Sequence, residues 1–254
     1  MVPLLYACLP NKTKSTYRRM WQAINDLPAF GADNPPKQLL ADFEPGAYGA
    51  ALEVFPAVDL SGCYFHLGQS VDRQVAHLGP RERYLSDRHF RVRVKSLPAL
   101  AFLPPGDVVE VFDQMQPSFA DDEVDLLAYF ENTYVGRPSP AGRRPPLFPI
   151  ALWNVHDRMA HGYTRTNNAV EGMHNSFSNY LLDGARPTVW AFIEGLKRQQ
   201  SLANIDMGKV AAGGVYKEAG KQVARNQRIA TLVQKYMDDG DGIRLCRGIA
   251  YNYM

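Results

Sequence analysis

Strands and helices are expected to alternate in the first 79 residues, and this alternation limits the fold more than any other sequence feature. Three short apolar runs predict strands at residues 2–10, 37–44 and 58–67. Each run is followed by apolar residues at helical spacing, at residues 13–27, 45–56 and 68–79. Such alternation is typical of an α/β unit, in which helices cover a sheet.

Strand signals weaken beyond about residue 80. There the i, i+3, i+4 spacing of apolar residues predicts helices at residues 109–116, 122–135 and 187–205. A stretch rich in proline and arginine, residues 136–146, predicts a loop. We therefore expect the second part of the chain to be mainly helical.

The composition is that of a folded chain. Of the 254 residues, 46% are hydrophobic and 21% are charged, which favours a buried core over disorder. Cys8, Cys63 and Cys246 are an odd number of cysteines at wide spacing, which indicates a reducing compartment rather than a disulfide framework. No apolar run approaches the ~20 residues of a membrane span. The apolar start lacks a basic region and stops at Pro10, so we expect neither a membrane partner nor a signal peptide.

Two carboxylates lie in the last residues of the second predicted strand. Asp42 and Glu44 lie at its carboxyl end, where α/β sheets often bind ligands. A carboxylate held there by stiff backbone suits a hard cation such as Mg²⁺, which takes oxygen ligands. The alternative is a structural role, because Asp42 also precedes a predicted helix and is a good N-cap residue.

Cys63 and His66 form a C-x-x-H element at the end of the third predicted strand. This is at best half of a zinc site, and no second C-x-x-C or H-x₃-H pair follows it. We expect a local packing and hydrogen-bonding element there, without a closed four-ligand zinc site.

A further polar cluster occupies a segment in which an apolar helical stripe might be looked for. Glu171, His174 and Asn175 share one helical face, behind Asn167 and Asn168. Di-metal helical bundles use the E-x-x-H spacing, but they need it twice, and it occurs once here. The sequence contains no G-x-S-x-G, P-loop or G-x-G-x-x-G motif.

Positive charge gathers in separate stretches although the net charge is only +2. Residues 81–95 hold six bases and two acids, and residues 197–235 hold eight bases and two acids. Such stretches suit a phosphate backbone, with solvated helix faces as the alternative reading. The candidate DNA-binding residues are Arg81, Arg83, Arg88, Arg91, Arg93, Lys95, Arg143, Arg144, Arg165, Lys197 and Arg198.

Six blocks carry a resemblance to a known family. In chain order they are VPLLYACLPNKTKSTYRRMW, LLADFEPGA, GCYFHLGQSVDRQV, ALAFLPPGDV, YFENTYVG and RTNNAVEGMHNSF. Each block is weak alone, but the ordered and suitably spaced set resembles the transposase domain of Mutator-like elements, from about residue 2 to residue 200.

The resemblance implies an RNase H-like core with an Asp, Asp, Glu site. That site would bind Mg²⁺ or Mn²⁺, and it would cleave and join DNA at transposon ends in the nucleus. Asp42 matches the second Asp and Glu171 matches the Glu, so both are the expected catalytic and metal-binding residues. The expected supporting residues are Cys63, His66, Asn167, Asn168, His174 and Asn175. The polar face around Glu171 would then line the metal site.

The resemblance also divides the chain. It implies a partial RNase H-like core at 1–79, a mainly helical insertion at 80–160, a return to the core at 161–205 and a basic helical tail at 206–254. The family's first Asp and first strands precede the block that opens this sequence, so we expect an N-terminally truncated α/β (α+β) fragment that does not cut DNA. The alternative is a domesticated, non-catalytic protein that binds DNA or another protein, and a homo-oligomer is compatible with both readings.

Overall fold

The computed structural model describes residues 5–28, 34–160, 188–214 and 220–254. It is a mixed structure in which helices dominate and strands are few, compatible with the expected α+β class. The chain forms two compact units, one of Met1–Pro10 with Asn167–Gly220, the other of Asn11–Thr166 with Lys221–Met254. Each unit is considered by itself.

A small parallel sheet lies in the larger unit. Strands β1 (Gln38–Ala41) and β2 (Asp59–Gly62) pair in parallel, with Gln38 opposite Asp59 and Ala41 opposite Gly62. Parallel strands need a crossover, and helix α2 (Pro45–Val54) supplies it. Proline at the first turn suits the start of α2, because that position has no helical hydrogen bond to lose. The result is the βαβ unit that the alternating pattern predicted.

Helix α1 (Lys14–Asn25) begins where Thr13 accepts a hydrogen bond from the backbone N–H of Thr16. It packs on α2 within the same unit. The indole N–H of Trp21 donates to the carbonyl of Ala47 at 3.2 Å, and its ring lies edge-on to Phe55. The helix predicted at 13–27 is therefore confirmed within one or two residues.

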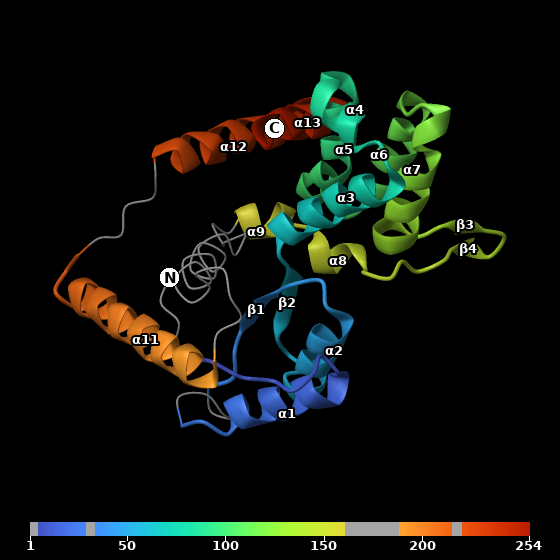
Figure 1. Ribbon diagram of the computed structural model, residues 1–254. Coiled ribbons are helices and arrows are strands. Elements are labelled where there is room, and N and C mark those ends of the chain that lie inside the picture. Colours follow the sequence, from blue (N-terminus) through green and yellow to red (C-terminus); the bar gives the residue numbers. More distant parts are fainter. Residues whose placement is uncertain (1–4, 29–33, 161–187, 215–219) are drawn as a thin grey trace. The chain divides into compact units, whose positions relative to one another are not determined.

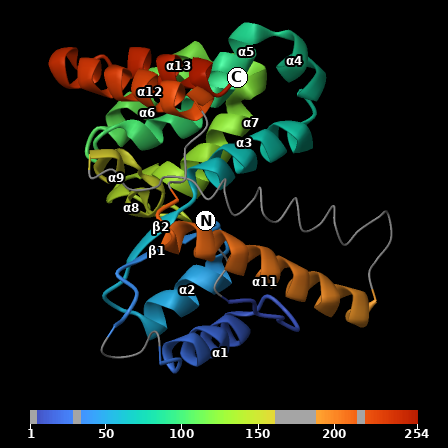
Figure 2. The same cartoon turned by 90° about the vertical axis from the view of Figure 1, so that its left-hand side faces the viewer.

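The remainder of the larger unit is helical. Its apolar core includes Phe90, Val94 and Leu97 of α5, which pack against α13. The helices are α3 (Tyr64–Leu78), α4 (Arg81–Ser86), α5 (Arg88–Ala99), α6 (Val108–Met115), α7 (Val124–Phe130), α8 (Ile150–Trp153), α9 (His156–Ala160), α12 (Gly220–Asp239) and α13 (Gly242–Asn252). The shorter turns are η1 (Leu100–Phe102), η2 (Gln116–Ser118), η3 (Asp121–Glu123) and the π-helical η4 (Glu131–Val135). Figure 1 and Figure 2 show β1 and β2 between the α1–α2 pair and these helices.

Aromatic rings join the sheet to the helical core. Tyr134 of η4 is buried and lies against the rings of Phe43, Phe148 and Trp153, at centroid distances of 5.8, 5.7 and 6.1 Å. Phe43 follows β1 by two residues, so its ring fixes the chain just beyond the strand. Its ring also covers Gly62, where an added Cβ would lie 2.5 Å from the ring.

The structure differs from the sequence-based expectations at several boundaries. Residues 5–10, part of a predicted strand, are not in a strand, and β1 and β2 are shorter than predicted. Helix α3 begins at Tyr64, before the predicted start, because Cys63 already has the extended backbone of an N-cap residue. The predicted loop at 136–146 contains a hairpin of β3 (Pro138–Ser139) and β4 (Gly142–Arg143).

In the smaller unit, the described residues include one long helix, α11 (Val189–Ala211). Thr188 caps it by accepting a hydrogen bond from the N–H of Ala191 at 3.2 Å. Across the described part of the chain, no helix combines the length and apolar character that a membrane crossing requires. The division into four segments at 79, 160 and 205 stays a prediction.

Candidate functional site

Asp42 and the C-x-x-H element meet at the carboxyl ends of β1 and β2. Asp42 directly follows β1, and Cys63 directly follows β2. The N–H of Cys63 donates to the carbonyl of Ala41 at 2.9 Å, which continues the ladder to this edge of the sheet. His66 lies in the first turn of α3, so its imidazole turns back toward the strand ends. Two elements that are separate in the sequence thus share one edge.

The central contact of this edge is between Asp42 and His66. The Nδ1 atom of His66 lies 2.8 Å from Oδ1 of Asp42. The His66 side chain is 20% exposed, whereas the Asp42 side chain is 55% exposed. The contact places the imidazole of His66 beside one carboxylate oxygen, in the position that outer residues take around metal ligands. The arrangement leaves Asp42 accessible from solvent.

Glu44 does not share this environment. Glu44, and not Asp42, occupies the N-cap position of α2, although its side chain makes no capping hydrogen bond. Its carboxylate accepts a hydrogen bond from the hydroxyl of Tyr17 at 2.8 Å and pairs with Lys12 at 3.4 Å. Burial, together with Glu44, raises the pKa of Tyr17 to about 12. Glu44 is directed to α1 rather than to the edge that carries Asp42.

The described residues do not assemble a complete metal centre. Among them, no group of three or more His, Cys, Asp or Glu side chains is placed to hold a metal ion. Glu171, His174, Asn167, Asn168, Asn175 and Arg165 lie outside the described residues, so their expected placement stays a prediction. Cys63 is fully buried at the N-cap of α3, which suits the packing role expected for it.

A polar pocket of about 450 Å³ lies on one face of the sheet and gave no signal in the sequence. Gln38, Asp59 and Ser61 line it from the strands, and Asn154 and Arg158 line it from the segment of α8 and α9. Burial lowers the pKa of Arg158, while Asp59 and Cys63 favour its charged form. Asp59 and Cys63 therefore offset only part of the cost of burying this charge.

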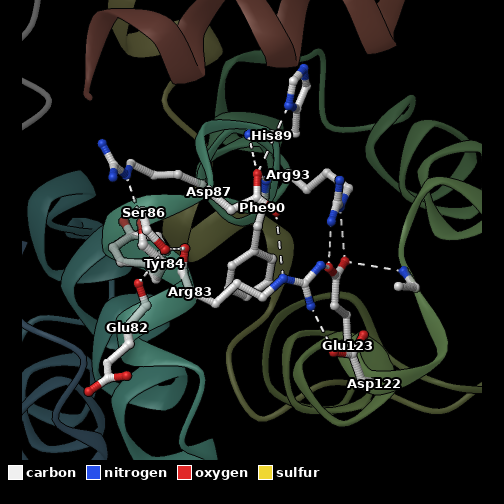
Figure 3. Close-up of polar contacts among 12 residues, drawn as sticks. Glu82, Arg83, Tyr84, Ser86, Asp87, His89, Phe90, Arg93, Asp122 and Glu123 are labelled. Atoms are coloured by element: carbon white, nitrogen blue, oxygen red, sulfur yellow. Dashed lines mark hydrogen bonds and ion pairs between the residues drawn. The ribbon is translucent and has the colours of Figure 1, made fainter.

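Most arginines of the first basic stretch, residues 81–95, contact other groups of the same protein. Figure 3 shows Arg83 and Arg93 converging on Glu123, whose side chain is 1% exposed. The guanidinium groups of Arg83 and Arg93 donate to this carboxylate at 2.7 and 2.9 Å. Arg83 also binds Asp122 at 2.7 Å. These two arginines hold α4 and α5 to η3.

Other predicted DNA-binding residues have varied surroundings. Lys95 pairs with Asp72 at 2.8 Å, Arg91 donates to the carbonyls of Tyr84 and Leu85, and Arg88 lies over the ring of Tyr251. Arg143 makes two hydrogen bonds to Asp113, and Lys197 pairs with Glu194 at 2.7 Å. Arg81, Arg144 and Arg198 are exposed. Contact of these residues with DNA stays a prediction.

Comparison of the chain with protein-family models, with curated proteins and with solved structures gave no match.

Proposed function

We propose that this chain is related to the transposases of Mutator-like elements. In this proposal its βαβ unit is part of an RNase H-like core, and Asp42 and Glu171 are two of the three carboxylates of that core. The observation that supports it best is the meeting of Asp42 with the C-x-x-H element, Cys63 and His66, at one sheet edge. Two of the six sequence blocks that carry the resemblance thus adjoin in space.

The proposed chemistry is cleavage and joining of DNA phosphodiester bonds with Mg²⁺ or Mn²⁺. Bound cations of this kind polarise a phosphoryl oxygen and activate an attacking oxygen. The described residues offer Asp42 and His66 but no third donor beside them, so they do not form a two-metal site. In this proposal His66 orients the Asp42 carboxylate, since its Nδ1 lies 2.8 Å from one oxygen.

We infer that the polypeptide of residues 1–254 does not itself cut DNA. The chemistry needs three carboxylates from neighbouring elements, and only Asp42 and Glu171 match them. Glu44 is no substitute, because its carboxylate binds Tyr17 and Lys12. Misplacing a reacting group by about 1 Å can cost on the order of 10²-fold in rate, and a missing ligand leaves the cation itself poorly held.

The second candidate is a non-catalytic role in which the protein binds DNA or another protein in the nucleus. Both a monomer and a homo-oligomer are compatible with this role. The observation that favours it is a cationic surface on α12 and α13, whose lining side chains include no carboxylate.

The test is an incubation of purified residues 1–254 with supercoiled plasmid and Mg²⁺ or Mn²⁺. We expect no nicking above the background of the Asp42→Ala and Glu171→Ala variants. Nicking by the unmodified protein that is lost in both variants would show a working site and overturn the proposed inactivity. Nicking that survives in both variants would point to a contaminant or to a different site.

A further inference from the structure

An open, basic pocket of about 580 Å³ lies on the larger unit where α12 and α13 meet. Three cations line it, Lys221, Arg225 and Arg228, together with Tyr251 and Asn252. Among its lining residues, which also include Met254 at the end of the chain, no side chain carries a carboxylate. Clustered cations without acids attract anionic groups and raise their local concentration.

The three cations come from one face of α12. Lys221, Arg225 and Arg228 are spaced i, i+4 and i+7, so they lie in a row along the helix. The helix is fixed in place by Ile229, which is fully buried, and by Tyr236, whose hydroxyl donates to Asp107 at 2.6 Å. A packed helix presents the row of charges in a constant arrangement, which lowers the entropy lost on binding.

Arg225 and Arg228 are positioned without being neutralised. The guanidinium carbon of Arg225 lies 5.3 Å from the centroid of the Tyr253 ring. The Nε–H of Arg228 donates to Oδ1 of Asn252 at 2.7 Å, and Asn252 donates to the carbonyl of Gly248 at 2.9 Å. Neutral rings and amides hold both side chains in place and leave the full positive charge.

Three cations of the first basic stretch, in contrast, are paired with carboxylates. Arg83 and Arg93 are satisfied by the buried carboxylate of Glu123, and Lys95 is satisfied by Asp72. Among the described residues, no carboxylate lies within 4.0 Å of the charged nitrogens of Arg225 or Arg228. The charge available to a ligand is therefore greater at Arg225 and Arg228 than at the paired cations Arg83, Arg93 and Lys95.

An exposed aromatic ring accompanies these charges. Tyr251 is 50% exposed and lines the pocket, and the guanidinium carbon of Arg88 lies 5.1 Å from its ring centroid. Aromatic side chains in cationic grooves serve as stacking platforms for nucleic-acid bases. A base within a duplex is already stacked and paired, so only an unpaired base can lie on such a ring.

We propose that this surface binds single-stranded nucleic acid. Lys221, Arg225 and Arg228 bind consecutive phosphates, and Tyr251 stacks an unpaired base. The inference rests on the second candidate function, which uses the same surface, and names its ligand; it uses none of the residues of the candidate metal site. Failure of the DNA-cleavage proposal and failure of the single-strand-binding proposal are therefore distinguished by separate measurements, nicking and anisotropy.

The test measures binding of a fluorescein-labelled oligo(dT) of about 20 nucleotides by anisotropy, in EDTA and over a range of NaCl concentrations. Each phosphate contact on a single strand contributes about 0.7 to the slope of log K against log salt. The combined change Lys221→Gln, Arg225→Gln and Arg228→Gln should therefore lower the slope by about 2. Arg19→Gln, on the exposed face of α1, is the matched control and should leave the slope unchanged.

Variants of Tyr251 provide a second, independent test of the proposal. Tyr251→Leu should weaken binding of the oligonucleotide by roughly 5- to 150-fold, the range expected for the loss of one stacked base, and Tyr251→Phe should retain it. The double change Arg225→Lys and Arg228→Lys keeps the charge and should retain most of the affinity. Circular dichroism confirms that each variant is folded before it is compared.

Several results would overturn the proposal. One is equal binding by the unmodified protein and the triple variant. A second is tighter binding of a duplex than of oligo(dT) at the same salt concentration. A third is no binding of oligo(dT) together with binding to vesicles of anionic phospholipid, which would make this a lipid surface.

Discussion

The buried carboxylate of Glu123 is predicted to be the largest single polar contribution to the stability of the larger unit. Its side chain is 1% exposed and accepts hydrogen bonds from Arg83, Arg93 and the backbone N–H of Ala120 (Figure 3). The change Glu123→Gln keeps the shape of the side chain. It removes the negative charge, however, and leaves two arginines directed at each other.

The size of the expected loss of stability in Glu123→Gln follows from how deeply the ion pairs are buried. Breaking a buried ion pair by changing one partner costs about 3–5 kcal/mol. The side chains of Arg83 and Arg93 keep 33% and 20% exposure, so water can solvate them in part, and the lower end, about 3 kcal/mol, applies. For a unit of this size, each kcal/mol shifts the melting temperature by about 2–4 °C, so Glu123→Gln should lower it by roughly 6–12 °C.

The assay is calorimetric unfolding, with urea denaturation as a second measure. The matched control is Asp122→Asn, which changes the neighbouring carboxylate. That side chain is 68% exposed and binds the same Arg83, so its loss should cost less than about 1 kcal/mol. If Glu123→Gln were no more destabilising than Asp122→Asn, burial would not set the strength of this cluster and the reasoning would be refuted.

Two further predictions concern the sheet edge and α1. Gly62→Ala should destabilise the protein by about 1–3 kcal/mol, because the added Cβ would lie 2.5 Å from the Phe43 ring. Gly68→Ala, in α3 with no atom within 4 Å, should instead stabilise it by about 0.5–1 kcal/mol, and the opposite order in urea denaturation would contradict the packing described. Tyr17 has a folded pKa of about 12, above its usual value of 10.0, so the stability it contributes is complete below pH 10 and is lost as the pH rises toward 12. Unfolding of Tyr17→Phe should lack this loss between pH 10 and 12, and an unchanged pH profile would count against the contact with Glu44.

Local patterns in the sequence predicted much of the fold. The helices at α1 and α2 follow from apolar spacing and from a capping threonine and a first-turn proline, which act within a few residues. Residues 5–10 show the limit of such patterns. An apolar run forms a strand only if another strand pairs with it, and an apolar run alone does not reveal its partner.

The candidate site was predictable only in part. Asp42 and Cys63 were expected near the carboxyl ends of their strands, but within the strands and not just after them. The contact of His66 with Asp42 depends on where α3 begins, and the predicted start lies four residues after the observed one, Tyr64. Runs of basic residues in the sequence predicted less well which cations are available to a ligand. Whether an arginine is available to a ligand depends on partners distant in the sequence, as Glu123 is from Arg93. The row on α12 could have been found from its i, i+4, i+7 spacing, but its Tyr251 and Asn252 partners could not.

The central proposal, that Asp42 and Glu171 are two carboxylates of one metal site, is tested most directly by Mn²⁺ binding measured by electron paramagnetic resonance. Asp42→Asn and Glu171→Gln should each weaken binding by roughly tenfold or more, and the double variant should be little weaker than either single variant. Glu44→Gln, which alters a carboxylate that binds Tyr17 instead, should bind Mn²⁺ as the unmodified protein does. Unchanged binding in either single variant, or losses that simply add in the double variant, would contradict a shared site.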